Sequence, residues 1–179
     1  AGMEEVTRLS TIADREGFVV VYPDGVGGPH GLGRLWNSGD CCGPPYWLGI
    51  DDGAMIAALL PAIAERLPIA TQRRYLVGYS NGGALAFDVV SRFTRHFAAA
   101  AVYAASMPAR GPLIGPQLAP PPDAPPSMLL IHARDDPRVP FYGREGLTKT
   151  APGQRHIAEY WAAANGCRER RTLATEGAV

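Results

Sequence analysis

Short apolar runs alternate with helical repeats of apolar residues along most of the chain. The run at 17–22 is rich in β-branched residues, which suits a buried strand of a parallel sheet. Further apolar runs predict strands at 73–78, 97–105 and 127–132. Apolar residues at helical spacing predict helices from about Met3 to Ala13, after Asp51, at 83–93 and at 154–164. This alternation, without repeats, predicts a doubly wound, mostly parallel α/β sheet.

Two connections carry further information. Asp51 and Asp52 precede an apolar repeat, so we interpret them as helix caps and not as catalytic residues, with Pro61 as a kink in that helix. The stretch from Val26 to Gly49 is rich in Gly, Pro and Trp and long for a connection, which favours a functional surface loop. Its glycines lack the spacing of a dinucleotide-binding loop.

Length and charge narrow the function classes. The 179 residues suit a single domain, 1–179. With 17 basic and 17 acidic residues and no basic block, a nucleic-acid or membrane-surface partner is not expected, and a neutral small molecule or polymer fits better. No apolar stretch approaches a membrane span, and no signal peptide is visible. Because the chain opens inside a helical pattern, we expect it to be a piece of a longer domain.

The pentapeptide Gly78-Tyr79-Ser80-Asn81-Gly82 carries the candidate chemistry. It lies between a predicted strand and a predicted helix, which is the context of a nucleophile elbow with Ser80 as the nucleophile. Small residues are expected around the serine, because a Cβ at either glycine would collide with backbone in so tight a turn. The alternative is a glycine-rich turn with a solvated serine.

A serine nucleophile needs a histidine to take its proton and a carboxylate to hold that histidine. Asp135 and Asp136 follow another predicted strand, and the carboxyl ends of parallel strands share one edge of the sheet. We therefore expect an aspartate and Ser80 to converge on one crevice. The backbone N–H of Asn81, at the start of a helix, is the expected oxyanion donor, and its side chain is expected to be structural.

Several segments together resemble the polyhydroxybutyrate depolymerase and feruloyl esterase group of α/β-hydrolases. They are ADREGFVVVYPDG, the loop from Trp36 to Gly43, DDGAMI, YLVGYSNGGALAF, IHARDDPRVPFYG and WAAANGC, running from about Ile12 to Cys167. The resemblance implies an α/β-hydrolase fold, Ser80 as nucleophile, and Asp136, directly before Pro-x-Val-Pro, as the triad acid in preference to Asp135. It also implies an extracellular protein that acts on esters without a cofactor.

Two parts of the family's pattern have no counterpart in this sequence. The family's second oxyanion donor, in a His-Gly segment, would precede Ala1, and its triad histidine would follow Val179. We therefore expect a domain truncated at both ends and nearly inactive as given. His156 is the only histidine after Asp136. Its place at the start of a helix is more simply that of a solvated residue, and His132 is expected to be structural.

The loop aromatics and the cysteines leave alternatives open. Trp36, Tyr46 and Trp47 could form a platform for an aromatic or polymer substrate, or could serve local packing. Cys41, Cys42 and Cys167 lack metal-ligand spacing, so no zinc site is expected. One disulfide with one free thiol, or three buried thiols in a cytoplasmic protein, are both compatible with the residues, and the resemblance favours disulfides without fixing their pairing.

The sequence therefore leads to two hypotheses. The first is a serine carboxylic-ester hydrolase that forms an acyl-enzyme on Ser80. The second is a non-catalytic remnant or binding module of the same fold that lacks the triad histidine. The acyl group is not specified, because fold and triad do not determine the acyl pocket.

Overall fold

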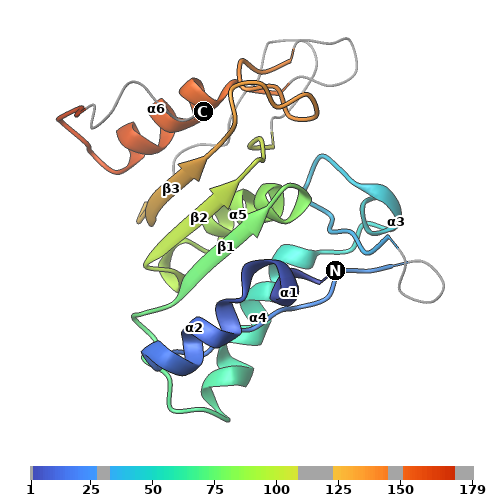
Figure 1. Ribbon diagram of the computed structural model, residues 1–179, viewed down its shortest axis with the longest axis vertical. Coiled ribbons are helices and arrows are strands. Elements are labelled where there is room, and N and C mark those ends of the chain that lie inside the picture. The colour runs from blue at the N-terminus through green and yellow to red at the C-terminus, as the bar shows by residue number, and fades with distance from the viewer. Residues whose placement is uncertain (1, 28–32, 109–122, 145–150, 172–179) are drawn as a thin grey trace.

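The computed structural model describes residues 2–27, 33–108, 123–144 and 151–171. In chain order its elements are α1 (Met3–Thr7), α2 (Leu9–Glu16), α3 (Gly43–Trp47), α4 (Asp52–Ala64), β1 (Tyr75–Tyr79), α5 (Asn81–Arg92), the 3-10 helix η2 (Thr94–His96), β2 (Ala99–Tyr103), β3 (Ser127–Ile131) and α6 (Gln154–Ala164) (Figure 1).

The three described strands form one parallel sheet in the order β1-β2-β3. In its register Gly78 pairs with Val102, and Val102 pairs with Leu130. Parallel neighbours need a crossover between them, and α5 supplies the one from β1 to β2. The predicted parallel α/β class is confirmed, and all three strands end at the same edge of the sheet.

The core lies between the sheet and helices α4, α5 and α6. On α5, Phe87, Val89 and Val90 are completely buried. Trp161 of α6 stacks on Phe87 with the ring centroids 6.4 Å apart, and Ile56 of α4 belongs to the same cluster. Each such side chain contributes roughly 1.5–3 kcal/mol by leaving water. This packing anchors α5, and with it the turn that begins the helix.

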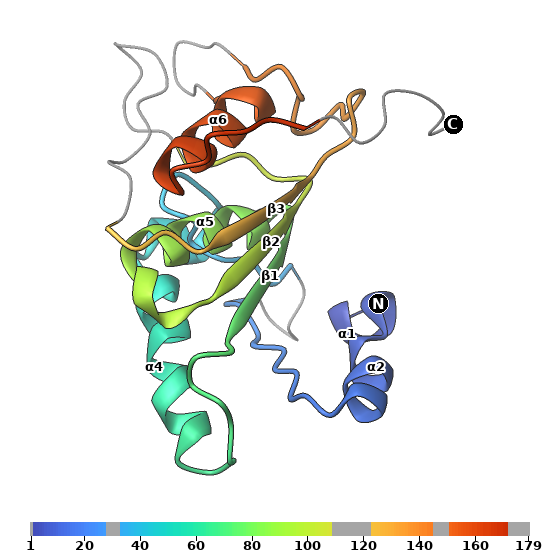
Figure 2. The same ribbon diagram turned by 90° about the vertical axis from the view of Figure 1, so that its left-hand side faces the viewer.

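The opposite face of the sheet is open in the described part of the chain. Figure 2 shows the sheet almost edge-on, with α4, α5 and α6 on one side and α1 and α2 standing away on the other. Side chains on this open face remain exposed: Tyr75, Val77, Tyr79, Tyr103, Leu129 and Ile131. Helices on both faces were predicted, but the described helices cover one face.

Two sequence predictions near the N-terminus are wrong. Residues 18–22 belong to no helix or strand, and Val19 is 51% exposed instead of buried. A strand requires a neighbour to accept its hydrogen bonds, and none of the described strands lies beside this segment. The predicted first helix is broken in two at Arg8, which adopts φ 52° between α1 and α2.

The other described elements follow the predictions closely. α6 has the predicted bounds, and Ile157 and Trp161 face the core as expected. Asp51 caps α4 by accepting a hydrogen bond from the Ala54 amide at 2.9 Å, and the helix continues through Pro61. Most of the proline-dense stretch at 111–126 lies outside the described residues. Among the described helices none is long and apolar enough to cross a membrane.

Candidate active site

Ser80 occupies the sharp turn between β1 and α5. Its backbone has φ 52° and ψ −120°, a conformation that residues with a side chain rarely adopt. Its amide donates to the carbonyl of Tyr103 at 2.9 Å, which extends the pairing of β1 and β2 by one residue. The residue is exposed, and its hydroxyl has no hydrogen-bond partner among the described residues. The turn thus presents a free hydroxyl at the carboxyl edge of the sheet.

The space around the turn explains two glycines of this segment, but not the pair that the sequence suggested. A Cβ at Gly78 would overlap the carbonyl oxygen of Gly82 and lie 2.7 Å from Gly83 Cα. A Cβ at Gly83 would lie 2.6 Å from the Cβ of Ala105 on the neighbouring connection. At Gly82 the nearest atoms belong to Trp36, 3.8 Å away, which is ordinary contact. The predicted collision is therefore confirmed for Gly78 and wrong for Gly82.

Asn81 begins α5 and has two separable parts. Its backbone N–H has no acceptor among the described residues, as is usual in the first turn of a helix. Its side chain accepts from the Trp36 amide at 2.7 Å and donates to the Trp36 carbonyl at 3.0 Å. The side chain therefore ties the long loop to the turn, while the amide stays open beside Ser80.

The loop that carries the aromatic residues is fixed at several points. Asp52 accepts a hydrogen bond from the Asn37 amide at 2.7 Å, and the Asn37 side chain donates to the carbonyl of Ile50. Cys41 and Cys42 form a disulfide, and Cys167 is an exposed free thiol. Asp52 is only 3% exposed, so it organises the loop, while Asp51 alone supplies the side-chain cap of α4.

The three candidate substrate-binding aromatics divide into two groups. Trp36 is partly buried, packs against the core and lies beside Gly82. These contacts favour the alternative in which Trp36 serves local packing. Tyr46 and Trp47 lie on α3 and are 43% and 77% exposed. Of the three, only Tyr46 and Trp47 therefore present exposed rings, on the loop that the hydrogen bonds of Trp36 tie to Asn81.

Asp136 lies in a tight turn after β3. Its Oδ1 accepts from the amides of Arg138 at 2.8 Å and Val139 at 2.9 Å. These two backbone hydrogen bonds, that of Val139 first, lower the pKa of Asp136 below its ordinary value. Asp135 makes no hydrogen bond or ion pair within the described chain. The turn therefore holds the Asp136 carboxylate ionised and oriented, and leaves Oδ2 available to a further donor.

His132 packs directly against this turn. Its side chain is 4% exposed, its Nε2 lies 2.7 Å from the Val139 carbonyl oxygen, and it is 3.6 Å from Asp136 Oδ2. The carbonyl can only accept, so Nε2 carries the proton that it shares with Val139. The sequence signal for this contact is the spacing of four between His132 and Asp136. The observed position of His132 agrees with a structural role, in which it holds the turn after Asp136 through the Val139 carbonyl.

Ser80 and Asp136 follow the two outer strands at one edge of the described sheet. Two strand spacings separate β1 from β3, roughly 10 Å at the backbone. No hydrogen bond joins either side chain to a described histidine. His156 is exposed in the first turn of α6, His96 lies at the opposite end of the strands, and His30 lies outside the described residues.

No group of three or more His, Cys, Asp or Glu side chains in the described ranges could hold a metal ion.

Residues 2–109, more than half of the chain, match the family described as Esterase PHB depolymerase. The chain is also 29% identical over 152 residues to the bifunctional acetylxylan esterase/xylanase XynS20E of Neocallimastix patriciarum. That alignment covers 84% of this chain and 19% of the relative, so the chain spans about a fifth of that protein. No solved structure gave a significant match.

Proposed function

Because the chain belongs to the PHB depolymerase family of esterases, we propose that it is a serine carboxylic-ester hydrolase that acts through an acyl-enzyme on Ser80. The observation that carries this proposal is the turn at Ser80. A residue at φ 52° places an exposed hydroxyl, without a hydrogen-bond partner among the described residues, directly before the open amide of Asn81. Strain of this kind is costly, and it is maintained here by the absence of side chains at Gly78 and Gly83.

In the proposed reaction Ser80 Oγ attacks the ester carbonyl while its proton passes to a histidine base. The negative charge that develops on the carbonyl oxygen is stabilised by the Asn81 N–H at the start of α5. The C–O bond to the alcohol then breaks, the alcohol leaves with that proton, and water hydrolyses the acyl-serine. Asp136 holds the histidine through Oδ2, since its Oδ1 is occupied by two backbone amides.

The base itself is not assigned to a residue of this chain. Of the histidines, His156 has only its order after Asp136 in its favour, and His132 is committed to Val139. We therefore expect low turnover from the chain by itself, since losing a triad member costs about 10⁶ in turnover in a well-studied serine protease. A non-catalytic binding module is the alternative function, and the observation that favours it is that no described histidine is hydrogen-bonded to Ser80 or Asp136.

The substrate class we propose is an ester with a short acyl group, either on a polysaccharide or within a polyester. The relative's name includes acetylxylan esterase and the family's name includes PHB depolymerase. Tyr46 and Trp47 on α3 offer exposed rings against which a polymer could lie. The Cys41–Cys42 disulfide supports an extracellular location for the protein.

The test measures hydrolysis of 4-nitrophenyl acetate by the chain, by Ser80→Ala and by the control Ser10→Ala, each with and without added imidazole. Imidazole can replace a missing base. The Ser80→Ala variant measures the hydrolysis that occurs without the serine, including hydrolysis by imidazole itself. We expect a Ser80-dependent rate that imidazole increases, and an acetyl adduct on the Ser80 peptide by mass spectrometry. Equal rates for the wild type and Ser80→Ala under both conditions, without an adduct, would favour the binding module. Acetylated xylo-oligosaccharide and 3-hydroxybutyrate oligomers then separate the two substrate classes.

A further inference from the structure

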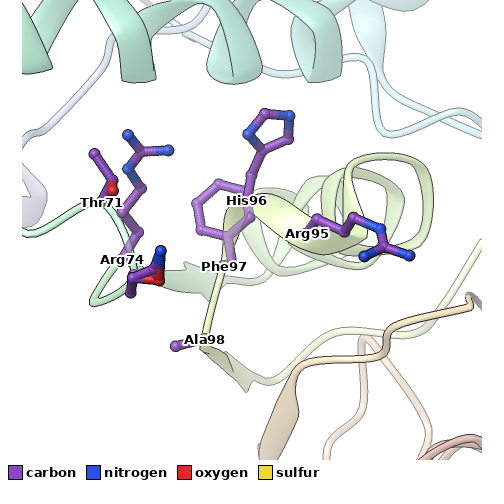
Figure 3. A pocket seen from close by; sticks show the side chains of 7 residues that line it. Thr71, Arg74, Arg95, His96, Phe97 and Ala98 are labelled. Carbon is purple, nitrogen blue, oxygen red and sulfur yellow. The ribbon is translucent and has the colours of Figure 1, made fainter.

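A cavity of about 330 Å³ lies at the end of the sheet opposite Ser80. The segment before β1 and the segment from η2 to β2 form its walls, and it is open to solvent. Its lining includes Thr71, Gln72, Arg74, Arg95, His96 and Phe97 (Figure 3). Arg74 precedes Ser80 by six residues of extended chain, which is roughly 20 Å. A ligand in this cavity would therefore not contact the ester-binding site.

The lining is cationic and holds no carboxylate. Arg74 and Arg95 make no ion pair or side-chain hydrogen bond with any described residue, and Nε of Arg74 is buried without an acceptor. Arg92, three residues before Arg95, does have partners: it forms ion pairs with Asp51 at 2.6 Å and with Asp88 at 2.9 Å. The two arginines of this lining therefore have no carboxylate partner among the described residues.

The hydrogen-bond donors of the cavity come from two neighbouring segments of the chain. Figure 3 shows the guanidinium of Arg74 and the ring of His96 extending in the same direction from two neighbouring segments, with Thr71 beside Arg74 and Arg95 extending to the other side. The Ala98 amide donates to the Arg74 carbonyl at 2.8 Å, which joins the two segments at the base of the cavity. Phe97 is 7% exposed and provides an apolar wall.

We propose that this cavity binds a phosphate or sulfate group carried by a small molecule. A planar guanidinium and an imidazole N–H match the oxygens of a tetrahedral oxyanion, and the Arg74 guanidinium has no carboxylate partner among the described residues. Since one water occupies about 30 Å³ of liquid, the cavity has room for such a group together with its substituent. Phe97 would contact that substituent.

The test is thermal unfolding of the full chain in sodium phosphate, sodium sulfate or sodium chloride at matched pH and ionic strength. Both anions also stabilise proteins generally by exclusion from their surface, so binding is the part of the rise in Tm that Arg74→Met removes. At about 50 mM anion we expect the wild type to gain about 5 °C over Arg74→Met. Arg168→Met, at an exposed arginine remote in sequence from the cavity, should keep the wild-type gain.

Equal gains for the wild type and Arg74→Met in both anions would overturn the proposal. A specific gain in one anion alone would identify phosphate or sulfate as the bound group, and a gain in both would show that the site recognises their shared geometry. If Arg74→Met does not fold, His96→Gln and Arg95→Met take its place. His96→Gln should then lose most of the gain, and an unchanged gain in both variants would equally refute the site.

Discussion

At the scale of single residues, the turn at Ser80 depends on the absence of a side chain at Gly78 as well as at Gly83. We predict that Gly78→Ala lowers the free energy of unfolding by about 1–3 kcal/mol, because its Cβ would press into the backbone of Gly82 and Gly83. Gly82→Ala is the matched control, with only Trp36 near its Cβ, and we expect a change within about 0.5 kcal/mol. Urea denaturation measures both, and similar losses in the two variants would contradict this account of the turn.

The link between Asn81 and Trp36 gives a second prediction at this scale. Asn81→Leu removes both hydrogen bonds to the Trp36 backbone and leaves that N–H and carbonyl without partners. We expect a loss of about 1–3 kcal/mol in the free energy of unfolding and a change in tryptophan fluorescence as the loop is released. Asn165→Leu is a comparison of the same type, at an amide that bonds Pro126 and its own helix. An unchanged stability and emission in Asn81→Leu would show that the loop is held by other contacts.

Asp136 gives a prediction in acid. Its pKa is lowered by the amides of Val139 and Arg138, so these bonds stabilise the folded state above the ordinary aspartate range and are lost as pH falls through the lowered value. We therefore expect the Asp136 carboxyl carbon to titrate below the ordinary aspartate pKa in a carbon-13 NMR experiment. An ordinary or raised value would mean that the turn does not hold the carboxylate as described.

At the scale of elements, Arg92 joins two helices. It pairs with Asp51, at the N-cap of α4, and with Asp88 on its own helix α5. Its hydrogen bond is the first cause of the lowered pKa of Asp51, about 2, and the Ala54 amide is the second. Burial raises the pKa of Asp88, an effect that Arg92 opposes.

Arg92→Met should therefore destabilise the chain in a pH-dependent way. At pH 7 we expect a loss of about 1 kcal/mol, kept small because Arg92 and Asp51 are 41% and 50% exposed. The lowered pKa of Asp51 contributes stability above about pH 4 that is lost as pH falls towards 2. The difference between wild type and variant should thus shrink over that interval in urea titrations. Arg155→Met, which breaks an exposed pair with Glu159, should show a smaller difference at every pH.

The elements also show what local patterns can and cannot predict. The bounds of α6, and those of α5 to within two residues, follow from apolar spacing along a single stretch of chain, and the burial of Phe87 and Trp161 follows from it as well. The run at 17–22 has equally strong β-branched character but forms no strand, because a strand also depends on a neighbour that local sequence does not describe. The break at Arg8 has no glycine or proline to signal it.

The candidate site divides in the same way. The turns at Ser80 and Asp136 were predictable, because each follows a predicted strand, and glycines mark the first turn and prolines the second. The contact of Asn81 with Trp36 joins residues 45 positions apart, and the cavity at Arg74 and His96 joins two separate connections. Contacts of this kind arise from the packing of the whole fold and leave no local pattern.

At the scale of the whole molecule, the open face of the sheet determines behaviour in solution. Val77 and Leu129 are 61% and 57% exposed on this face, in register on either side of Ala101, and their strands β1 and β3 are the edge strands of the described sheet. Contiguous apolar surface and unpaired strand edges both favour self-association. We therefore expect the chain to be poorly soluble and to elute from size exclusion as oligomers.

Replacing both residues by lysine tests this expectation directly. Val77→Lys with Leu129→Lys should increase the monomer fraction in light scattering while changing the free energy of unfolding by about 1 kcal/mol or less, since both side chains already face water. Val89→Lys is the opposite control, because that side chain is completely buried in the core and a lysine there should unfold the chain. A wild-type chain that runs as a single monomeric species and melts cooperatively would contradict the prediction, and would mean that this apolar face is compatible with a stable monomer.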